Sequence, residues 1–521
     1  MMNRAPDITP IWPAGTQICN GQMRFRGIRA EELVDRFGTP LYLMDLDTMV
    51  GRAQWFRDVA VTAFPNVTTR VSYSTKAFIS KEVVRMLLKQ GLNIDTCSMG
   101  EMRIALAAGA PGRRMVLHGN NKSDEEIELA IEQGFSKIVV DDPEEPARIA
   151  AIAHRLGKVA RVMLRVTVGI HAGGHEYIST AHEDQKFGVP LLKSGSDPTV
   201  LDIDFSDESS SRVESSEVHS LHDHLDEGNA QGQGSVKISS LYSHTSAEAR
   251  ENVDMELVRA MDVIADGPAL AVLKDIHSRS EDLELVGIHA HIGSQIHDAT
   301  AYVESAKRLM LLRRTFWATD GFMLPEIDLG GGFSIAYTDN DTSMDIESTM
   351  AELSDAITQT THRLGLPAPI LSFEPGRWIA GPSGVTLYRV GTIKPVQLSD
   401  GTVRTYVSVD GGMSDNIRPA LYGADYAVRL ANRCGSERSM LVRVVGKHCE
   451  SGDIVVHDAQ LPDDLKRGDI LAVPVTGAYC RTMASNYNQL PTPPVVGICE
   501  GKARVLVKSL SIDDLLALDQ G

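Results

Sequence analysis

Eight short apolar segments, separated by stretches of helical periodicity, constrain the fold of this 521-residue chain more than any other feature. They span residues 70–73, 92–96, 115–118, 138–140, 162–166, 285–291, 326–329 and 370–373. Between the first two, residues 80–90 carry their apolar side chains on one helical face, and Gly91 follows as a stop signal. Strands alternating with helices predict a parallel sheet. Eight such units favour a closed (β/α)8 TIM-like barrel over an open doubly wound sheet.

The pattern changes after Arg377. Segments 384–390, 404–409, 440–445 and 470–475 have the composition of β-strands separated by turns. We therefore expect a barrel over residues 36–376 and a second, all-β domain built from residues 1–35 together with 377–521. The stretch from about 191 to 252 is rich in Ser, Asp, Glu, His and Gly. Because such a composition buries little apolar surface, we expect a disordered insertion there.

Charge and composition exclude several classes of protein. The net charge of −18 argues against a general nucleic-acid binder, which needs a basic face. No apolar run reaches membrane-spanning length, and the first seven residues lack the apolar core of a signal peptide, so a cytoplasmic location is the default expectation. The 6 cysteines form no Cys-x-x-Cys pair, which argues against a zinc ribbon or a disulfide scaffold.

Polar side chains gather at the ends of the predicted barrel strands, where a β/α barrel places its active site. In chain order they are Lys76, Asp95, Ser98, Glu101, His118, Arg165, His289, His291, Ser294, Asp328 and Glu374. A lysine in such a position either pairs with an anion or attacks a carbonyl group as an amine. The strand ends therefore predict an active site that contains Lys76.

Glycines follow the last two barrel segments. Gly330–Gly332 follow the seventh segment, and Gly376 with Arg377 follows the eighth. Backbone N–H groups of glycine can approach an anion with no Cβ in the way, and barrels build phosphate sites after strands seven and eight. A phosphate held there, with the amine of Lys76 across the mouth, indicates a phosphorylated aldehyde cofactor, and pyridoxal 5'-phosphate fits.

Two further groups suit this cofactor. Glu374 is placed to keep the ring nitrogen protonated, and His291 could stack on the ring face. The spacing of His289 and His291 has a competing interpretation as a metal pair, as in barrel hydrolases. That chemistry needs more His and Asp ligands at later strand ends, where this chain offers glycines instead. We therefore expect no metal, and a structural role for His289.

Four motifs lie in the predicted β domain: 410–419 followed by Tyr422, Cys449-Glu450-Ser451-Gly452-Asp453, Gly477-Ala478-Tyr479, and Ser485-Asn486-Tyr487-Asn488. Alone, each is explained by turn chemistry. Taken with the Lys76 run, His118-Gly119-Asn120-Asn121-Lys122, the 291–295 motif, the triple glycine and Glu374-Pro375-Gly376-Arg377, they resemble the fold-type III pyridoxal-phosphate decarboxylases. Within these, the chain is most similar to the diaminopimelate decarboxylase family, from about residue 38 to 516 except for the insertion.

The resemblance implies an alanine racemase-like barrel with a second β domain. It also implies decarboxylation of meso-2,6-diaminopimelate to L-lysine and CO2, the last step of lysine biosynthesis. Lys76 would hold the cofactor as a Schiff base, and Cys449 would donate a proton to the α-carbon. The implied cofactor contacts are Lys76, Asp95, Glu101, Arg165, His291, Ser294, Gly330, Gly331, Gly332, Glu374, Pro375, Gly376, Arg377 and Tyr479. The implied substrate contacts are Arg377, Arg418, Tyr422, Glu450 and Tyr479.

In this family Cys449 and Glu450 would reach the barrel of a partner subunit, which implies a homodimer with two shared sites. Arg418 and Arg377 suit the far carboxylate of diaminopimelate by forked hydrogen bonds, and Glu450 suits its far ammonium. The alternative is a sister decarboxylase acting on ornithine, arginine or a carboxylated polyamine. An enzyme for ornithine would favour acids over Arg418, because the far end of that substrate carries only an ammonium group.

Overall fold

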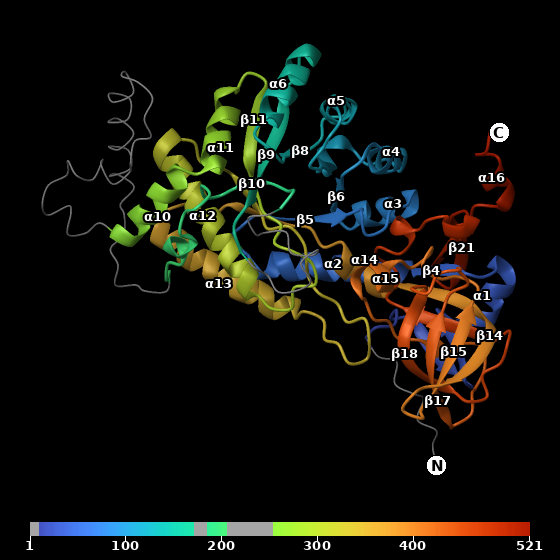
Figure 1. Cartoon of the computed structure of the whole chain (residues 1–521). Coiled ribbons are helices and arrows are strands. Elements are labelled where there is room, and N and C mark those ends of the chain that lie inside the picture. The colour runs from blue at the N-terminus through green and yellow to red at the C-terminus, as the bar shows by residue number, and fades with distance from the viewer. Residues whose placement is uncertain (1–9, 171–184, 206–253) are drawn as a thin grey trace, which may run out of the picture.

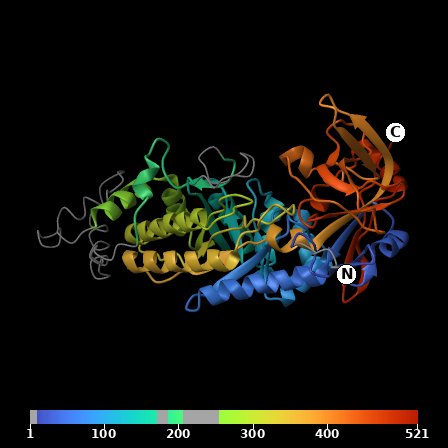
Figure 2. The same ribbon diagram turned by 90° about the horizontal axis from the view of Figure 1, so that it is seen from below.

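The computed structural model describes residues 10–170, 185–205 and 254–521 of the chain. A barrel surrounded by helices and a β-rich domain lie next to each other along the long axis of the molecule (Figure 1; Figure 2). No helix in these described ranges is both long enough and apolar enough to cross a membrane.

Eight parallel strands form the barrel. They are β5 (Thr69–Ser74), β6 (Asn93–Thr96), β7 (Met115–Leu117), β8 (Lys137–Val140), β9 (Ala160–Thr167), β11 (Leu283–His289), β12 (Glu326–Asp328) and β13 (Ile370–Phe373). Each strand pairs with the next in this order, and β13 pairs with β5, so the sheet closes on itself. All eight correspond to segments predicted from the sequence, and the prediction of a closed barrel rather than an open sheet is confirmed.

Helices cover the outside of the barrel (Figure 1). They are α2 (Leu46–Ala63), α3 (Lys81–Lys89), α4 (Met99–Ala107), α5 (Asp124–Glu132), α6 (Glu145–Leu156), α10 (Met255–Ala265), α11 (Pro268–Ser278), α12 (Thr300–Asp320) and α13 (Ile346–Leu364). Three begin at serine caps whose hydroxyl groups accept a backbone N–H: Ser80 on α3, Ser98 on α4 and Ser123 on α5. These local signals start each helix directly after a strand-end loop, so they help to fix where the strand-end side chains lie.

The predicted disordered insertion begins too early in the sequence. After β10 (Val189–Pro190), residues 191–205 include a 3-10 turn (Pro198–Leu201), and Leu191, Leu201, Ile203 and Phe205 are buried. Nearby, the guanidinium group of Arg308 lies 2.9 Å from the carboxylate of Asp202. The prediction was wrong for 191–205 because a few apolar side chains in a polar segment suffice to anchor it. Residues 206–252 of the predicted insertion lie outside the described ranges.

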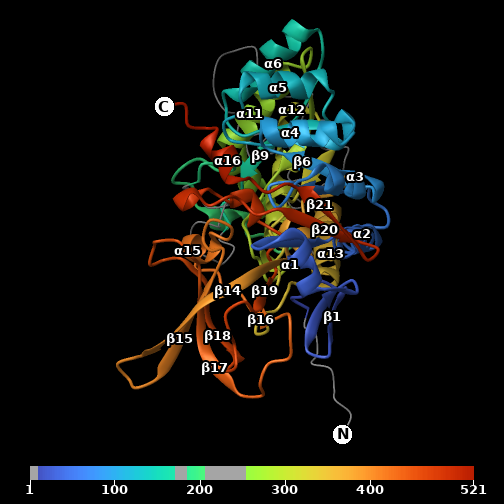
Figure 3. The same cartoon turned by 90° about the vertical axis from the view of Figure 1, so that its right-hand side faces the viewer.

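The second domain is built on the long strand β14 (Gly384–Gln397), which pairs with β15 (Val403–Val409), β19 (Ile470–Pro474) and β4 (Leu41–Asp45). The same sheet contains β16 (Arg429–Leu430), β17 (Ser439–Val445), β18 (Ile454–Pro462), β20 (Val495–Cys499) and β21 (Lys502–Val507). Figure 3 shows β14, β15, β17 and β18 extending together away from the barrel helices. Strand β4 belongs to this sheet, although the predicted boundary at residue 36 assigns it to the barrel.

Smaller elements complete the chain. The N-terminal segment forms a separate sheet of β1 (Thr16–Cys19), β2 (Gln22–Phe25) and β3 (Ile28–Arg29), followed by α1 (Ala30–Phe37). Short helices α14 (Arg377–Ala380), α15 (Arg418–Tyr422) and α16 (Ile512–Leu516) lie in the C-terminal part. The remaining 3-10 turns are Gly112–Arg114, Gly381–Ser383, Arg481–Met483 and Tyr487–Gln489.

Hydrogen bonds join the β domain to the mouth of the barrel. The backbone N–H of Tyr479 donates to the carbonyl of Ala77 over 2.9 Å. The hydroxyl of Thr482 donates to the carbonyl of Lys76 over 3.1 Å. The loop after β19 is therefore fixed against the strand end that carries Lys76, and any site at the barrel mouth includes residues from both domains.

Candidate active site

A cavity of about 1070 Å3 occupies the barrel mouth, between the strand ends and the β domain. Most of the predicted site residues line it: Lys76, Asp95, Glu101, Arg165, His291, Ser294, Gly331, Gly332, Glu374, Pro375, Gly376, Arg377, Arg418, Tyr422 and Tyr479. Residues separated by several hundred positions in the sequence thus face one space. Its size suits a cofactor together with a small substrate.

Lys76 lies directly after β5, and its backbone is held from two sides. On the barrel side, the hydroxyl of Thr75 donates to the carbonyl of Asp95 over 2.6 Å. On the other side, Thr482 binds the carbonyl of Lys76 itself. The side chain of Lys76 lines the cavity and remains exposed to it. This arrangement presents a primary amine from a fixed backbone position, as a nucleophile that binds an aldehyde requires.

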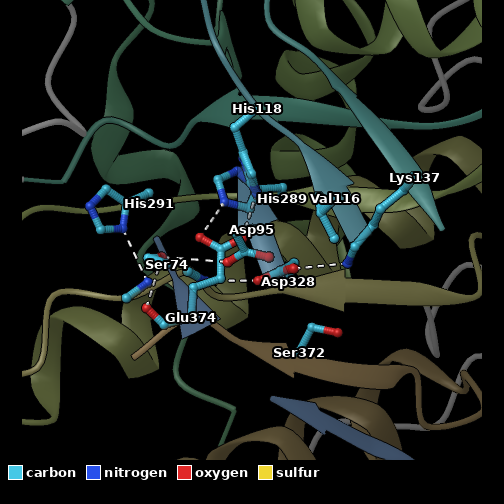
Figure 4. A network of polar contacts seen from close by, with 12 residues as sticks. Ser74, Asp95, Val116, His118, Lys137, His289, His291, Asp328, Ser372 and Glu374 are labelled. Carbon is cyan, nitrogen blue, oxygen red and sulfur yellow. Dashed lines mark hydrogen bonds and ion pairs between the residues drawn. The ribbon is translucent and has the colours of Figure 1, made fainter. Parts of the chain in front are cut away.

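Two histidines, His118 and His289, lie next to the carboxylate of Glu374, which follows β13 directly (Figure 4). Nε2 of His118 lies 3.1 Å from its Oε1, and Nε2 of His289 lies 3.4 Å from its Oε2. Burial raises the pKa of the Glu374 carboxyl, but the charges and hydrogen bonds of the two imidazoles outweigh burial and hold that pKa well below its usual value. Glu374 is therefore a buried carboxylate in its ionised form.

The same carboxylate has capacity for a further donor. Oε1 of Glu374 is buried and has no well-aligned hydrogen bond among the residues that the structure describes, although His118 is close. A buried acceptor without a hydrogen bond destabilises the protein until a donor binds to it. The ring N–H of pyridoxal phosphate is such a donor, so the residues present fit this cofactor.

The imidazole ring of His291 lines the cavity, as expected of a ring that stacks on the cofactor. Its Nδ1 accepts the backbone N–H of Gly331 over 3.1 Å, so the ring hydrogen must lie on Nε2. Burial, followed by the charges of Lys76 and Arg165, lowers the pKa of His291 well below its ordinary value. The imidazole is therefore neutral, and its orientation is fixed from one edge, which suits stacking on an aromatic ring.

The glycine run differs from the predicted cradle of three free amides. The N–H of Gly330 donates to Oδ1 of Asp328 over 3.1 Å, and that of Gly331 is taken by His291. Close backbone packing explains these glycines better: a Cβ on Gly331 would lie 2.3 Å from the carbonyl oxygen of Glu374, and one on Gly332 would lie 2.5 Å from that of Gly293. Among the hydrogen bonds of the described residues, the amide of Gly332 has no acceptor, so of the three amides it is the one that remains available for an anion.

Side chains supply the rest of the anion site. A guanidinium nitrogen of Arg377, the first residue of α14, donates to the hydroxyl of Ser294 over 2.8 Å, and another donates to the hydroxyl of Tyr337. The Arg377 guanidinium also lies 4.6 Å from the ring centre of Tyr479. A fixed cation next to a hydroxyl group suits a phosphate or a carboxylate.

Arg418, at the start of α15, is a second cation in the cavity wall, and it is buried. Its Nε donates to the hydroxyl of Tyr426 over 2.9 Å, and its guanidinium lies 5.0 Å from the ring centre of Tyr337 and 5.8 Å from that of Tyr422. Burial lowers the pKa of Arg418, but the neighbouring hydroxyls more than offset this and the net shift is upward. No carboxylate in the described ranges forms an ion pair with Arg418, so its remaining N–H groups can bind an anionic ligand.

Three other predicted cofactor residues lie around the same cavity. Asp95 is buried next to Ser74, and burial together with the charge of Glu374 raises its pKa well above the usual value. The guanidinium of Arg165 lies 4.4 Å from the ring centre of Phe187. Glu101 accepts the backbone N–H of Cys97 over 2.8 Å.

The structure does not bring Cys449 and Glu450 into this cavity. Both are exposed on the loop between β17 and β18, and neither is among the lining residues. The backbone N–H of Cys449 donates to Oδ1 of Asn488 over 3.2 Å, and Oε1 of Glu450 accepts the N–H of Gly452 over 3.2 Å. Within one chain, the predicted proton donor is thus separate from the predicted cofactor lysine.

Two residues of the site were given no role from the sequence. His118 was placed at a strand end and within a motif, a signal that could have given it a role beside Glu374. Tyr337 contacts both Arg377 and Arg418 from the loop after β12. No periodicity or motif marks Tyr337, because tertiary packing alone brings that loop to the cavity.

Fold and site define a class of protein: a fold-type III enzyme that uses pyridoxal phosphate for decarboxylation. In agreement, residues 54–199 and 267–381 match the family model described as "Pyridoxal-dependent decarboxylase, pyridoxal binding domain".

The donor atoms of His118, His289 and Glu374 lie within 4.8 Å of one another, a spacing that a metal ion can use.

Similar proteins narrow the class. The chain is 38% identical to the diaminopimelate decarboxylase of Mycobacterium tuberculosis, over 99% of this chain and 100% of that protein. It is 34% identical to the diaminopimelate decarboxylase of Bacillus subtilis, over 96% of this chain and 95% of the other. The crystal structure of the M. jannaschii diaminopimelate decarboxylase in complex with L-lysine superimposes with a TM-score of 0.74, at 26% identity over 97% of this chain and 98% of that one. The chain belongs to the diaminopimelate decarboxylase family.

Proposed function

We propose that this chain decarboxylates meso-2,6-diaminopimelate to L-lysine and CO2, with pyridoxal 5'-phosphate as its cofactor. Arg418 carries the choice of substrate. It is a buried cation in the cavity wall with no ion pair among the described residues, and it needs a carboxylate partner. Diaminopimelate has a carboxylate at the end remote from the reaction, whereas ornithine has none. The relatives named above support the same reaction.

The cofactor has a suitable group for each of its parts. Lys76 would hold its aldehyde end, Glu374 would accept its ring N–H, and His291 would lie against its face. Ser294 and Arg377, with the amide of Gly332, would hold its phosphate. When bound, pyridoxal phosphate supplies a protonated ring that accepts the electron pair released as the carboxylate leaves.

The protein orients the substrate and supplies a proton. Arg418 would fix the far carboxylate by forked hydrogen bonds, and Tyr422 and Tyr479 would flank the substrate chain from the same wall. Holding the remote end fixes which bond at the reacting carbon faces the cofactor, and orientation of this kind lowers the barrier. A thiol at the α-carbon would then act as general acid, the role we assign to Cys449.

Because Cys449 and Glu450 lie outside the cavity of their own chain, we propose that a second copy delivers them. The cavity of one protomer would receive Cys449 of the partner subunit as proton donor and Glu450 of the partner subunit as the acid for the far ammonium. A homodimer with two equivalent sites follows from twofold symmetry. A cytoplasmic location stays a prediction from the sequence.

The test is release of CO2 and lysine from meso-diaminopimelate by the purified protein with pyridoxal phosphate. We expect turnover in the wild type and none in Lys76→Ala. Release of CO2 from ornithine, arginine or a carboxylated polyamine, without turnover of diaminopimelate, would keep the class of reaction but contradict the role of Arg418. No turnover of any of these substrates would refute the proposal.

A further inference from the structure

Glu374 is flanked by two histidines, and the proposed reaction gives neither of them a role. His118 comes from the end of β7 and His289 from the end of β11, and each places its Nε2 next to a different carboxylate oxygen of Glu374, at 3.1 and 3.4 Å (Figure 4). The two imidazole rings contact each other edge-on, with centroids 5.3 Å apart. Both oxygens of one carboxylate therefore have an imidazole within reach.

Both imidazoles direct their Nε2 atoms toward Glu374. Nδ1 of His289 is buried and has no hydrogen-bond partner among the described residues. A hydrogen on this Nδ1 would be a buried unpaired donor, so the geometry places the ring hydrogen of His289 on Nε2. Burial lowers the pKa of His118, despite the opposing effect of Glu374. Nε2 of His289 is within hydrogen-bond distance of Oε2 of Glu374, and Nε2 of His118 lies 3.1 Å from Oε1 without a well-aligned hydrogen bond.

Other charged groups surround this cluster. Those whose charges act on Glu374 or on its immediate neighbours are Asp95 from β6, Lys137 from β8, Arg165 from β9, Asp328 from β12 and His291. Lys137 is held by Asp328 at 2.9 Å and by Glu326, so its charge is already compensated. When both are ionised, Asp95 and Glu374 repel each other, and the pKa of Asp95 rises while that of Glu374 stays low. The two imidazoles next to Glu374 account for this difference.

The loop that carries His118 is fixed by a buried ion pair. Nζ of Lys122 donates to the carbonyl of Gly119 over 2.7 Å and to both oxygens of Glu145, at 3.0 and 2.9 Å. Gly119 has φ of +129°, a backbone conformation that side chains rarely adopt. The motif His118-Gly119-Asn120-Asn121-Lys122 thus turns the chain after β7 and holds His118 against Glu374.

We propose that His118, together with His289, keeps Glu374 ionised by placing its Nε2 against the carboxylate, so that the proton between Glu374 and the cofactor ring remains on the ring nitrogen. This inference rests on the proposed function and assigns His118 as a positioning residue that acts through Glu374. A carboxylate that accepts more hydrogen bonds is a weaker base. Removing a donor would therefore transfer the shared proton from the ring nitrogen to Glu374.

Two substitutions test this. His118→Leu removes the donor, and His118→Gln keeps an N–H group. The matched control is His154→Leu on α6, where an exposed histidine lies 3.1 Å from the carboxylate of Asp282 and does not line the cavity. The direct readout is the 15N chemical shift of pyridoxal phosphate labelled at its ring nitrogen and bound to each holoenzyme.

We expect a protonated ring nitrogen in the wild type, in His118→Gln and in the control, and an unprotonated one in His118→Leu. The kcat of His118→Leu should fall about tenfold with little change in KM, the loss expected from one charge-assisted hydrogen bond. Loss of the donor raises the pKa of Glu374, so the carboxylate takes up a proton at a higher pH. The acid limb of the kcat profile should therefore move up by about one pH unit.

A protonated ring nitrogen and an unmoved acid limb in folded His118→Leu would overturn the proposal. If that variant fails to fold, His118→Asn replaces it, because its shorter amide cannot reach Glu374 and the same 15N shift decides. Loss of activity on chelation, restored by a divalent metal ion, would also overturn it, since the imidazoles would then be metal ligands. If the wild type binds the labelled cofactor but does not turn over diaminopimelate, the 15N result still tests this inference, and only the proposed function fails.

Discussion

Two inactive subunits should restore each other's activity when combined in one dimer. Lys76 lines the cavity of its own chain, whereas Cys449 lies outside it. In a mixed dimer of Lys76→Ala and Cys449→Ala subunits, one site contains both substitutions. The other site contains intact Lys76 and an intact Cys449 of the partner subunit. One working site of two predicts about half of the wild-type turnover per dimer.

The assay uses co-expressed subunits with different affinity tags, purification through both tags, and lysine release from diaminopimelate. Each parent homodimer gives the background rate. The matched control combines Lys76→Ala with Glu374→Ala: both residues line the same cavity, so neither site of that mixed dimer is intact and it should stay inactive. A Lys76→Ala/Cys449→Ala dimer of normal size that turns over no faster than its parents would refute the shared site.

Three further predictions concern other parts of the molecule. Arg418→Met should lower kcat/KM for diaminopimelate about a hundredfold, since two charge-assisted hydrogen bonds are lost; thermal unfolding and cofactor titration should match the wild type. Lys137→Met should lower the free energy of unfolding by about 3–5 kcal/mol at pH 7, because Asp328 then stays buried without its cation and Glu326 keeps only Arg70. The pKa of Glu326 then rises in the folded variant, so the stability of the variant should recover as pH falls from 7 to 5; a urea titration that shows no recovery would contradict this. In the wild type, burial raises the pKa of Glu326, but Lys137 and Arg70 hold it below its usual value. The stabilisation of the fold by ionised Glu326 is therefore fully present above about pH 4.3 and is lost at lower pH. Asn488→Leu should reduce turnover about tenfold and Asn488→Asp much less, because only the latter keeps the acceptor for the N–H of Cys449; equal loss in both variants would argue against positioning of Cys449.

The barrel could be predicted from the sequence because its signals are local. Each strand is a short apolar run, and several of the following helices start at a serine cap, as at Ser80 and Ser98. Since a barrel brings all its strand ends to one mouth, the position of Lys76 or Glu374 directly after a strand places it at the cavity. Strand β4 was not predicted to join the second sheet, because its pairing with β14 links residues more than 300 positions apart.

The use of each polar group within the site could not be predicted. The amides of Gly330 and Gly331 follow a strand as a phosphate cradle would, yet Asp328 and His291 occupy them. His291 comes from a neighbouring strand, so only the closed barrel decides that its Nδ1 meets Gly331. Residues 191–205 were misjudged for a related reason. The burial of a few apolar side chains in this segment depends on their tertiary contacts, which cannot be predicted from composition.

The sequence alone determined the order of strands and helices, the residue types at each strand end, and hence the chemistry available at the mouth: an amine, a buried acid, two cations and glycines. Local propensity and hydrophobic periodicity are enough for that. Tertiary structure decided which of these groups are already paired and which are left for a ligand. It places His118 and His289 on the two oxygens of Glu374, leaves Arg418 without a counterion among the described residues, and keeps Cys449 out of its own cavity. Pairing of this kind depends on distances of a few ångströms between distant segments, and only the folded chain sets those distances.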